Sequence, residues 1–127
     1  MKAILLDTHA WAWTLSNGAR LSKRARASIE QAQAVLVSPI SFFEIGQRVR
    51  LGKWPDMEPL IDRLPALLDE QGAAVAALDP TVCTTAGTMR WAHRDPFDRL
   101  LAATAIRYNV PIVSADVVFD GLVARVW

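Results

Sequence analysis

Short apolar runs that alternate with longer, helix-length segments are the feature of this sequence that most restricts its fold. The runs are Lys2–Leu6, Ala34–Ser38, Ala74–Leu78 and Pro111–Ser114, and Ala124–Val126 is a short fifth candidate. Apolar runs without polar alternation are typical of strands buried on both faces, and parallel strands need a crossover, usually a helix, between them. The pattern therefore predicts an α/β fold of three layers, in which a mostly parallel sheet of four to five strands lies between helices.

Helix start and stop signals lie between the apolar runs. Helices are expected after Asp7, from Ser22 to about Gln33, over Ser41–Leu51, from near Asp56 to Gln71, after Asp79-Pro80 and from Asp95-Pro96 to Tyr108, with a helical turn near Val117–Gly121. Aspartate and serine are frequent N-caps, proline fits the first helical position, and glycine ends a helix in the left-handed conformation. The two Asp-Pro pairs, together with Gly52 and Gly72, therefore set most of these boundaries.

Length and composition restrict the class of protein further. A chain of 127 residues is the size of one domain, so a single domain over residues 1–127 is expected. Hydrophobic residues make up 52% of the chain and the mean hydropathy is +0.18, which excludes a mainly disordered chain. The apolar runs are too short to cross a bilayer, and Asp7 interrupts the first of them before it resembles a secretion signal. No membrane partner and a cytoplasmic location are therefore expected.

The cysteine, histidine and tryptophan residues favour core packing over a disulfide or zinc site. Cys83 is the one cysteine and cannot form an internal disulfide, so we expect it to be a small buried residue. His9 and His93 lack the paired spacing of a zinc site and are interpreted as packed or capping residues. The tryptophans at positions 11, 13, 91 and 127 are expected mostly in the core.

Acidic residues follow the ends of the expected strands. Asp7 and Asp116 follow the first and fourth strands, and Glu44 lies in the helix after the second. Asp98 precedes Leu101 by one helical turn, which places it on the apolar stripe that should face the sheet. Ligands of open parallel sheets bind at the carboxyl ends of the strands, and gathered carboxylates suit Mg²⁺ or Mn²⁺. The acids therefore indicate a site for phosphoryl or phosphodiester chemistry.

Each of these acids also has a structural interpretation. Asp79 and Asp95 are explained as helix caps. Asp7 is either a cap or a site residue, and Asp116 is either a turn residue or a site residue. Asp98 also suits the positive end of its helix.

Glu44 is the acid whose spacing most favours a structural role. Ser41 and Glu44 have the spacing of a capping box, and Arg48 lies four residues after Glu44. The spacing also turns Glu44 away from the apolar stripe of the helix, which consists of Phe42, Ile45, Gly46 and Val49. The spacing alone therefore favours a structural Glu44.

Four segments, in order and spacing, match a known family. LLDTHAWAW, SPISFFEIGQRVRLGKW, HRDPFDRLLAATA and VPIVSAD resemble the PIN-domain nucleases, and more closely the VapC-type toxins of bacterial type II toxin-antitoxin modules. The resemblance covers essentially the whole chain. It implies an acidic pocket that holds one or two Mg²⁺ or Mn²⁺ ions, with Asp7, Glu44, Asp98 and Asp116 at its four acidic positions. Asp95 matches a non-catalytic aspartate, and Gln47-Arg48 stands where the family often has lysine.

The resemblance also implies a function and its partners. Proteins of this kind are endoribonucleases in which the metal activates a water molecule to attack an RNA phosphate, and they usually form homodimers. A small antitoxin silences them by entering a groove beside the site, where Trp54 is a candidate contact. If the four site acids are set aside, the chain has nine acidic and fourteen basic residues. The surface around the site then carries a net charge of about +5, which suits RNA. The candidate phosphate contacts are Arg48, Arg50, Lys53, Arg94 and Arg99, each equally consistent with a solvated surface.

Two other functions are consistent with acids at strand ends. One is an aspartate-dependent phosphatase or a phospho-receiver domain, but His9 stands where such phosphatases carry a second aspartate, and a receiver would have to use Asp79, which proline follows. The other is a non-catalytic PIN relative that binds RNA or protein, against which the presence of all four acids counts.

Overall fold

The computed structural model describes residues 3–127 and contains all the strands that the apolar runs predict. The strands are β1 (Ala3–Leu6), β2 (Ala34–Val37), β3 (Ala74–Val75), β4 (Ile112–Val113) and β5 (Arg125–Val126). The α-helices are α1 (Thr8–Ser16), α2 (Lys23–Gln31), α3 (Pro39–Arg50), α4 (Leu64–Glu70), α5 (Pro80–Thr88) and α6 (Pro96–Tyr108). Shorter 3₁₀ helices are η1 (Gly18–Arg20), η2 (Pro55–Arg63) and η3 (Val117–Phe119). The expected first residue of the first strand, Lys2, lies outside the described residues.

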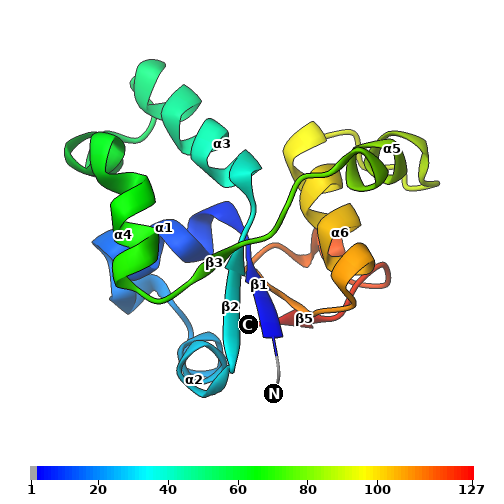
Figure 1. The fold of residues 1–127 in the computed structure, drawn as a ribbon, viewed down its shortest axis with the longest axis horizontal. Coiled ribbons are helices and arrows are strands. Elements are labelled where there is room, and N and C mark those ends of the chain that lie inside the picture. Colours follow the sequence, from blue (N-terminus) through cyan, green and yellow to red (C-terminus); the bar gives the residue numbers. More distant parts are fainter. Residues whose placement is uncertain (1–2) are drawn as a thin grey trace.

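The sheet is parallel throughout and has the order β3-β2-β1-β4-β5 (Figure 1). Leu6 pairs with Val37 of β2 on one side and with Val113 of β4 on the other. The strands β2 and β3 are added in turn on one side of β1, and β4 and β5 are added on the other side of β1. The strand order therefore reverses between β1 and β4. A receiver domain has the order 2-1-3-4-5 and places its third strand beside the first. That alternative does not fit this sheet.

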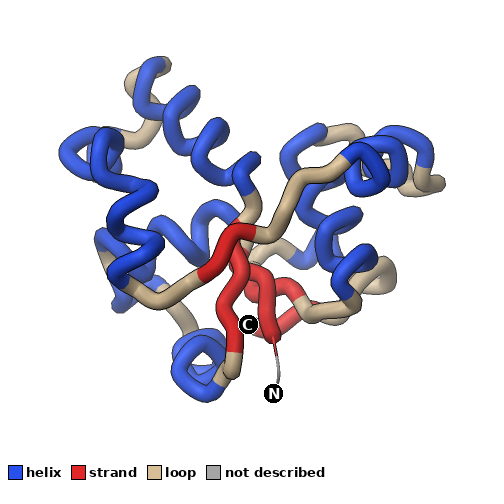
Figure 2. The backbone as a smooth tube through the Cα atoms, in the orientation of Figure 1, coloured by secondary structure: helices blue, strands red, loops and turns tan. Residues whose placement is uncertain are grey.

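Side chains that alternate along β1 divide the core into the two halves of a three-layer fold. Ile4 and Leu6 pack with residues of α1 to α4, whereas Leu5 packs with Leu101 and Ile112 on the α6 side. Figure 1 shows α1 to α4 on one side of the strands and α5 and α6 on the other. The connection from β3 to α5, residues 76–79, is an extended loop in Figure 2 and carries the chain from one half to the other. The predicted three-layer α/β architecture is confirmed.

The expected helices differ most from the observed ones at the start of the third helix and in the segment after Asp56. The third helix begins at Pro39, not Ser41, because the Ser38 hydroxyl accepts a hydrogen bond from the Ile40 N–H at 3.1 Å. The segment expected as one helix from Asp56 to Gln71 is 3₁₀ up to Arg63 and α-helical from Leu64. Pro59 lies inside the 3₁₀ segment, where it lacks the N–H that an α-helix would use.

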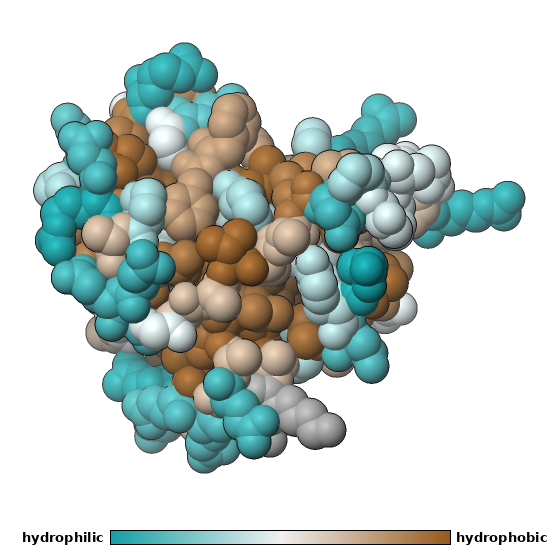
Figure 3. Space-filling view, viewed as in Figure 1, coloured by the Kyte–Doolittle hydropathy of each residue, from teal (hydrophilic) through white to brown (hydrophobic). Residues whose placement is uncertain are grey.

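The third strand is also shorter than expected, since it ends at Val75 rather than Leu78. Among the strands of residues 3–127, β3 pairs with β2 alone, and both of its residues are exposed. Figure 3 has the same view as Figure 1 and shows apolar side chains in the middle of the face toward the viewer, with hydrophilic side chains over the outer helices. None of the helices within residues 3–127 combines the length and the apolar character that crossing a bilayer requires.

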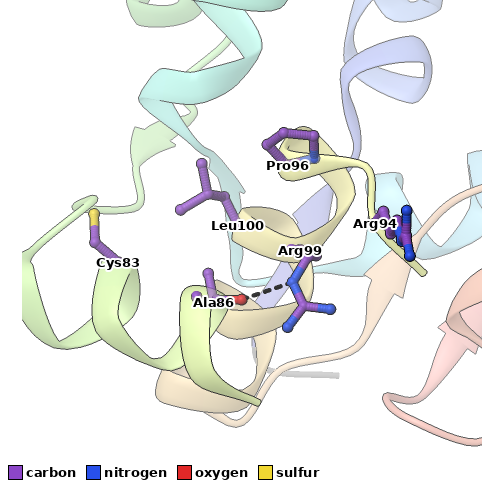
Figure 4. Close-up of a pocket in the computed structure, with 7 residues that line it drawn as sticks. Cys83, Ala86, Arg94, Pro96, Arg99 and Leu100 are labelled. Atoms are coloured by element: carbon purple, nitrogen blue, oxygen red, sulfur yellow. Dashed lines mark hydrogen bonds between the residues drawn. The ribbon is translucent and has the colours of Figure 1, made fainter. Parts of the chain in front are cut away.

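The predictions for cysteine and tryptophan have different outcomes. Cys83 is exposed, so the prediction of a buried residue was wrong. Helix α5 turns Val82 and Ala86 toward α6, and Cys83 lies at the rim of the cleft between these helices (Figure 4). Trp11 is fully buried, as expected, and its indole N–H donates to Gln71 Oε1 at 2.9 Å. Trp13, Trp91 and Trp127 are half-buried against the core.

Candidate metal centre

Asp7 lies at the carboxyl end of β1, where it also caps α1. Its Oδ1 accepts a hydrogen bond from the Ala10 N–H at 2.7 Å, and the residue is only 9% exposed. The pKa of the Asp7 carboxyl is raised to about 6, mainly by burial. Hydrogen bonds with Ser114 and Ala10 oppose this shift, and the charges of Asp98 and Glu44 add to it. The cap interpretation of Asp7 is therefore confirmed, and the site interpretation is compatible with it, because one oxygen accepts the cap bond while the carboxylate lines a pocket.

Glu44 reaches the same pocket from α3, and the structural interpretation of its spacing was partly wrong. Ser41 is not a cap, because the helix begins earlier, and its hydroxyl instead forms a buried hydrogen bond of 2.9 Å with the Thr8 hydroxyl. This bond ties α3 to α1 directly beside Asp7. Glu44 is 7% exposed and is buried next to Ile45 rather than turned away from the core. The expected ion pair with Arg48 is present at 3.1 Å.

Asp98 and Asp116 come from the other half of the fold. Asp98 lies in the first turn of α6, and a hydrogen bond of 2.7 Å joins its Oδ2 to Nε2 of His93. Burial raises the pKa of the Asp98 carboxyl, and the hydrogen bond with His93 opposes that shift. Asp116 follows β4 and caps η3 by accepting from the Val118 N–H at 3.0 Å. Its own N–H donates to the buried Ser114 hydroxyl, which fixes the turn after the strand.

The four predicted acids converge on one cavity of about 150 Å³. It is lined by Asp7, Thr8, His9, Glu44, Arg48, Asp95, Asp98, Leu101 and Asp116. The cavity lies where β1 and β4 end, which is the point at which the strand order reverses and where parallel sheets bind their ligands. Five carboxyl groups and one arginine form its charged lining. This donor set fits Mg²⁺ or Mn²⁺, which prefer carboxylate oxygens.

Two residues of the site were not identified from the sequence. His93 bonds to Asp98, and one ligand atom each from His93, Asp95 and Asp98 lie within 4.8 Å of one another. His9 lines the cavity, and its ring stacks on Trp54 at 4.7 Å and contacts Trp13 at 5.6 Å. Burial, followed by the charge of Arg48, lowers the pKa of His9. The only available signal was proximity in sequence to Asp7 and Asp98, which does not show where an imidazole points.

The five predicted phosphate contacts are not equivalent. Arg48 lines the acidic cavity, and Arg50 and Lys53 are exposed at the end of α3 and just beyond it. Arg94 is exposed and borders the separate cleft of about 250 Å³ between α5 and α6 (Figure 4). Arg99 does not fit the prediction, because its guanidinium donates to the carbonyls of Ala86, Met89, Trp91 and His93. These bonds hold the loop before α6 in place.

Replacing Arg99 with lysine is expected to lower the free energy of unfolding by about 3 kcal/mol, because one ammonium cannot satisfy four carbonyls. Urea denaturation measures the change. Arg107→Lys, at an exposed position of the same helix, is the control and should stay within about 0.5 kcal/mol of the wild type. Full stability of Arg99→Lys combined with weaker RNA binding would restore Arg99 as a phosphate contact.

Asp95 lines the cavity, but its hydrogen bonds are those of a helix cap. Its Oδ1 accepts from the Phe97 N–H at 2.8 Å and from the Asp98 N–H at 3.4 Å. Asp95→Ala should therefore lower the free energy of unfolding by about 1 kcal/mol, whereas Asp95→Asn, an equally good cap, should preserve it. Thermal melts and Mn²⁺ titrations of both variants test this, and we expect metal affinity to change little in either. Loss of metal binding in folded Asp95→Asn would show that Asp95 is a ligand.

This chain is similar to known proteins in both sequence and structure. The family model for the PIN domain matches residues 4–123. Ribonuclease VapC22 of Mycobacterium tuberculosis is 31% identical over 117 residues, which cover 91% of this chain and 88% of that protein. A toxin-antitoxin complex from Klebsiella pneumoniae has a similar structure, with a TM-score of 0.69, 15% identity, and coverage of 98% of this chain and 96% of that chain. FitAcB from Neisseria gonorrhoeae has a TM-score of 0.66 at 22% identity, over 96% of this chain and 95% of that chain.

Proposed function

The chain belongs to the PIN-domain family and, within it, to the VapC-type toxins, and from this we propose that it is a metal-dependent endoribonuclease that cleaves RNA phosphodiester bonds. The observation that carries the proposal is the convergence of Asp7, Glu44, Asp98 and Asp116 on one cavity at the switch point of the sheet. The similarity to a protein named as a ribonuclease supports the choice of RNA as the substrate.

The four acids would hold one or two Mg²⁺ or Mn²⁺ ions. A bound ion supplies positive charge that activates a water molecule for attack on the phosphorus and stabilises the leaving oxygen. The chain's own contribution is to fix the donors: Asp7 is held by its cap bond to Ala10, and Asp98 by its hydrogen bond to His93. Rigid donors reduce the rearrangement needed when the reaction begins.

RNA would reach the cavity across a basic surface. Arg48 lines the cavity and Arg50 and Lys53 lie at the exposed end of α3, so this part of the molecule can contact phosphates on one side of the cleavage point. Arg94, just before α6, is the candidate on the other side. Arginine is suited to this role because its planar guanidinium can make two hydrogen bonds to one phosphate.

The proposed partners are a small antitoxin and a second copy of this chain, in the cytoplasm. Toxin-antitoxin complexes among the similar structures support an antitoxin partner. Trp54, half-buried against His9, is proposed as an antitoxin contact. Phe43 and Leu51 are exposed apolar side chains that an antitoxin could also cover.

The decisive test is incubation of the purified full chain with a labelled single-stranded RNA and with DNA of the same sequence. We expect cleavage of RNA with Mg²⁺ or Mn²⁺, none with chelator, and recovery when metal is restored. Release of phosphate from a phosphomonoester without strand cleavage would indicate a phosphatase. Binding of RNA without cleavage under every metal condition would indicate a non-catalytic module.

A further inference from the structure

The cavity contains an internal ion pair between Arg48 and the buried Glu44. Nε and Nη2 of Arg48 lie 3.2 Å and 3.1 Å from the same carboxylate oxygen, Oε2 of Glu44. The Glu44 side chain is 9% exposed, whereas that of Arg48 is 40% exposed. The acid is thus fixed within the site and the base lies at its mouth.

Arg48 is the one lysine or arginine among the residues that line the cavity, and it faces five carboxyl groups. Among residues 3–127, Arg48 is also the only side chain that forms a hydrogen bond or ion pair with Glu44. A buried carboxylate without a counter-charge is strongly unfavourable. The guanidinium therefore supplies the positive charge that Glu44 needs when no ion is bound.

We propose that Arg48 is a built-in competitor for the metal ion: its guanidinium occupies Glu44 until a divalent cation displaces it. This inference rests on the proposed function, since it takes Glu44 to be a ligand. Both N–H donors of Arg48 bond to Oε2 of Glu44, which leaves that oxygen little capacity for a cation. An ion held by the other oxygen, Oε1, would lie beside the like charge of the guanidinium, so the ion and Arg48 compete for Glu44.

The surroundings of Arg48 allow the pair to open. Its guanidinium carbon lies 5.9 Å from the centre of the Trp54 ring, which offers a second favourable contact for the charge. Because the side chain is partly exposed, it can leave Glu44 by changing rotamer without movement of α3. Arg48 then carries its charge at the mouth of the cavity, where the proposed phosphate contacts lie.

Removing the competitor should strengthen metal binding, which a merely structural role would not do. With Mn²⁺ alone as the probe, we expect Arg48→Met to bind the ion about tenfold more tightly than the wild type, measured by calorimetry or electron paramagnetic resonance. Arg20→Met is the matched control, because Arg20 lies 5.2 Å from the Trp13 ring but forms no ion pair with a carboxylate of the described residues. Its Mn²⁺ affinity should change by less than about twofold, since Arg20 is exposed, does not line the cavity and has a charge that solvent screens.

A second variant keeps the test valid if Arg48→Met does not fold without metal. Arg48→Lys retains the charge but has a single donor group, so its Mn²⁺ affinity should lie between those of the wild type and Arg48→Met. In chelator, Arg48→Met should melt below Arg20→Met, because only the former leaves Glu44 unpaired.

The outcomes separate this inference from the proposed function. If wild-type Mn²⁺ binding requires Asp7 but is equally strong or weaker in the Arg48 variants, the competitor role is wrong and the metal site stands. If the wild type binds no Mn²⁺ at all, or binds it equally well after Asp7→Asn, the metal site itself is wrong.

Discussion

Asp7→Asn is expected to reduce metal-dependent RNA cleavage by more than about a hundredfold, since changes even one layer outside a metal site lower activity by ~10- to 100-fold. Asparagine keeps the size of the side chain and the oxygen that accepts from Ala10, so the cap of α1 survives. What is lost is the negative charge that would hold the ion. Single-turnover cleavage rates of separately purified proteins, at matched metal concentration, measure the effect.

Asp79→Asn is the matched control for this substitution. Asp79 also follows β3 as a helix cap, and its Oδ1 accepts from the Val82 N–H at 2.8 Å, but it does not line the acidic cavity. Its cleavage rate should equal that of the wild type. Equal rates for Asp7→Asn and the wild type would refute the catalytic assignment of Asp7.

In the metal-free protein, the contribution of Asp7 to stability should be lost as the pH rises from about 4 to 7. The pKa of Asp7 is raised from 3.8 to about 6 in the folded state, so the folded chain binds more protons than the unfolded one across this range. The stabilisation is complete below the unfolded pKa and is lost as the pH passes through the folded pKa. At 1.36 kcal/mol per unit, Asp7 alone accounts for about 3 kcal/mol.

Urea denaturation of the wild type and Asp7→Asn in chelator, at pH values across this range, isolates the contribution. As the pH rises, the free energy of unfolding of Asp7→Asn should increase relative to that of the wild type, because asparagine does not titrate. Added Mg²⁺ should raise the free energy of unfolding of the wild type at neutral pH. The increase is about 2.7 kcal/mol when the free ion concentration is 100 times the dissociation constant. A difference between the two proteins that does not change with pH would contradict the burial of an ionisable Asp7.

Local signals in the sequence accounted for most of the fold. The apolar runs located all five strands, and Ser22, Asp79 and Asp95 cap the helices that they were expected to cap. These features are predictable because a cap bond joins atoms only two or three residues apart, and because an unbroken apolar run has few stable solutions other than a strand covered on both faces.

The candidate site was only partly predictable. Position at strand ends selected Asp7 and Asp116, and the apolar stripe of α6 selected Asp98, but the spacing around Glu44 favoured a structural role. The family resemblance, not the helix pattern, indicated Glu44 as a site residue. The packing of α3 against α1 through Ser41 and Thr8 is what turns Glu44 into the cavity.

By itself the sequence determined the positions of the strands and most of the helix caps, because each depends on neighbours within a few residues. Only the tertiary structure decided that Arg99 is used up by four carbonyls, that His93 holds Asp98, and that Cys83 is exposed. Each of these roles depends on the direction of a side chain relative to another packed element. Sequence spacing fixes the face of a helix but not the partner that packing places opposite that face.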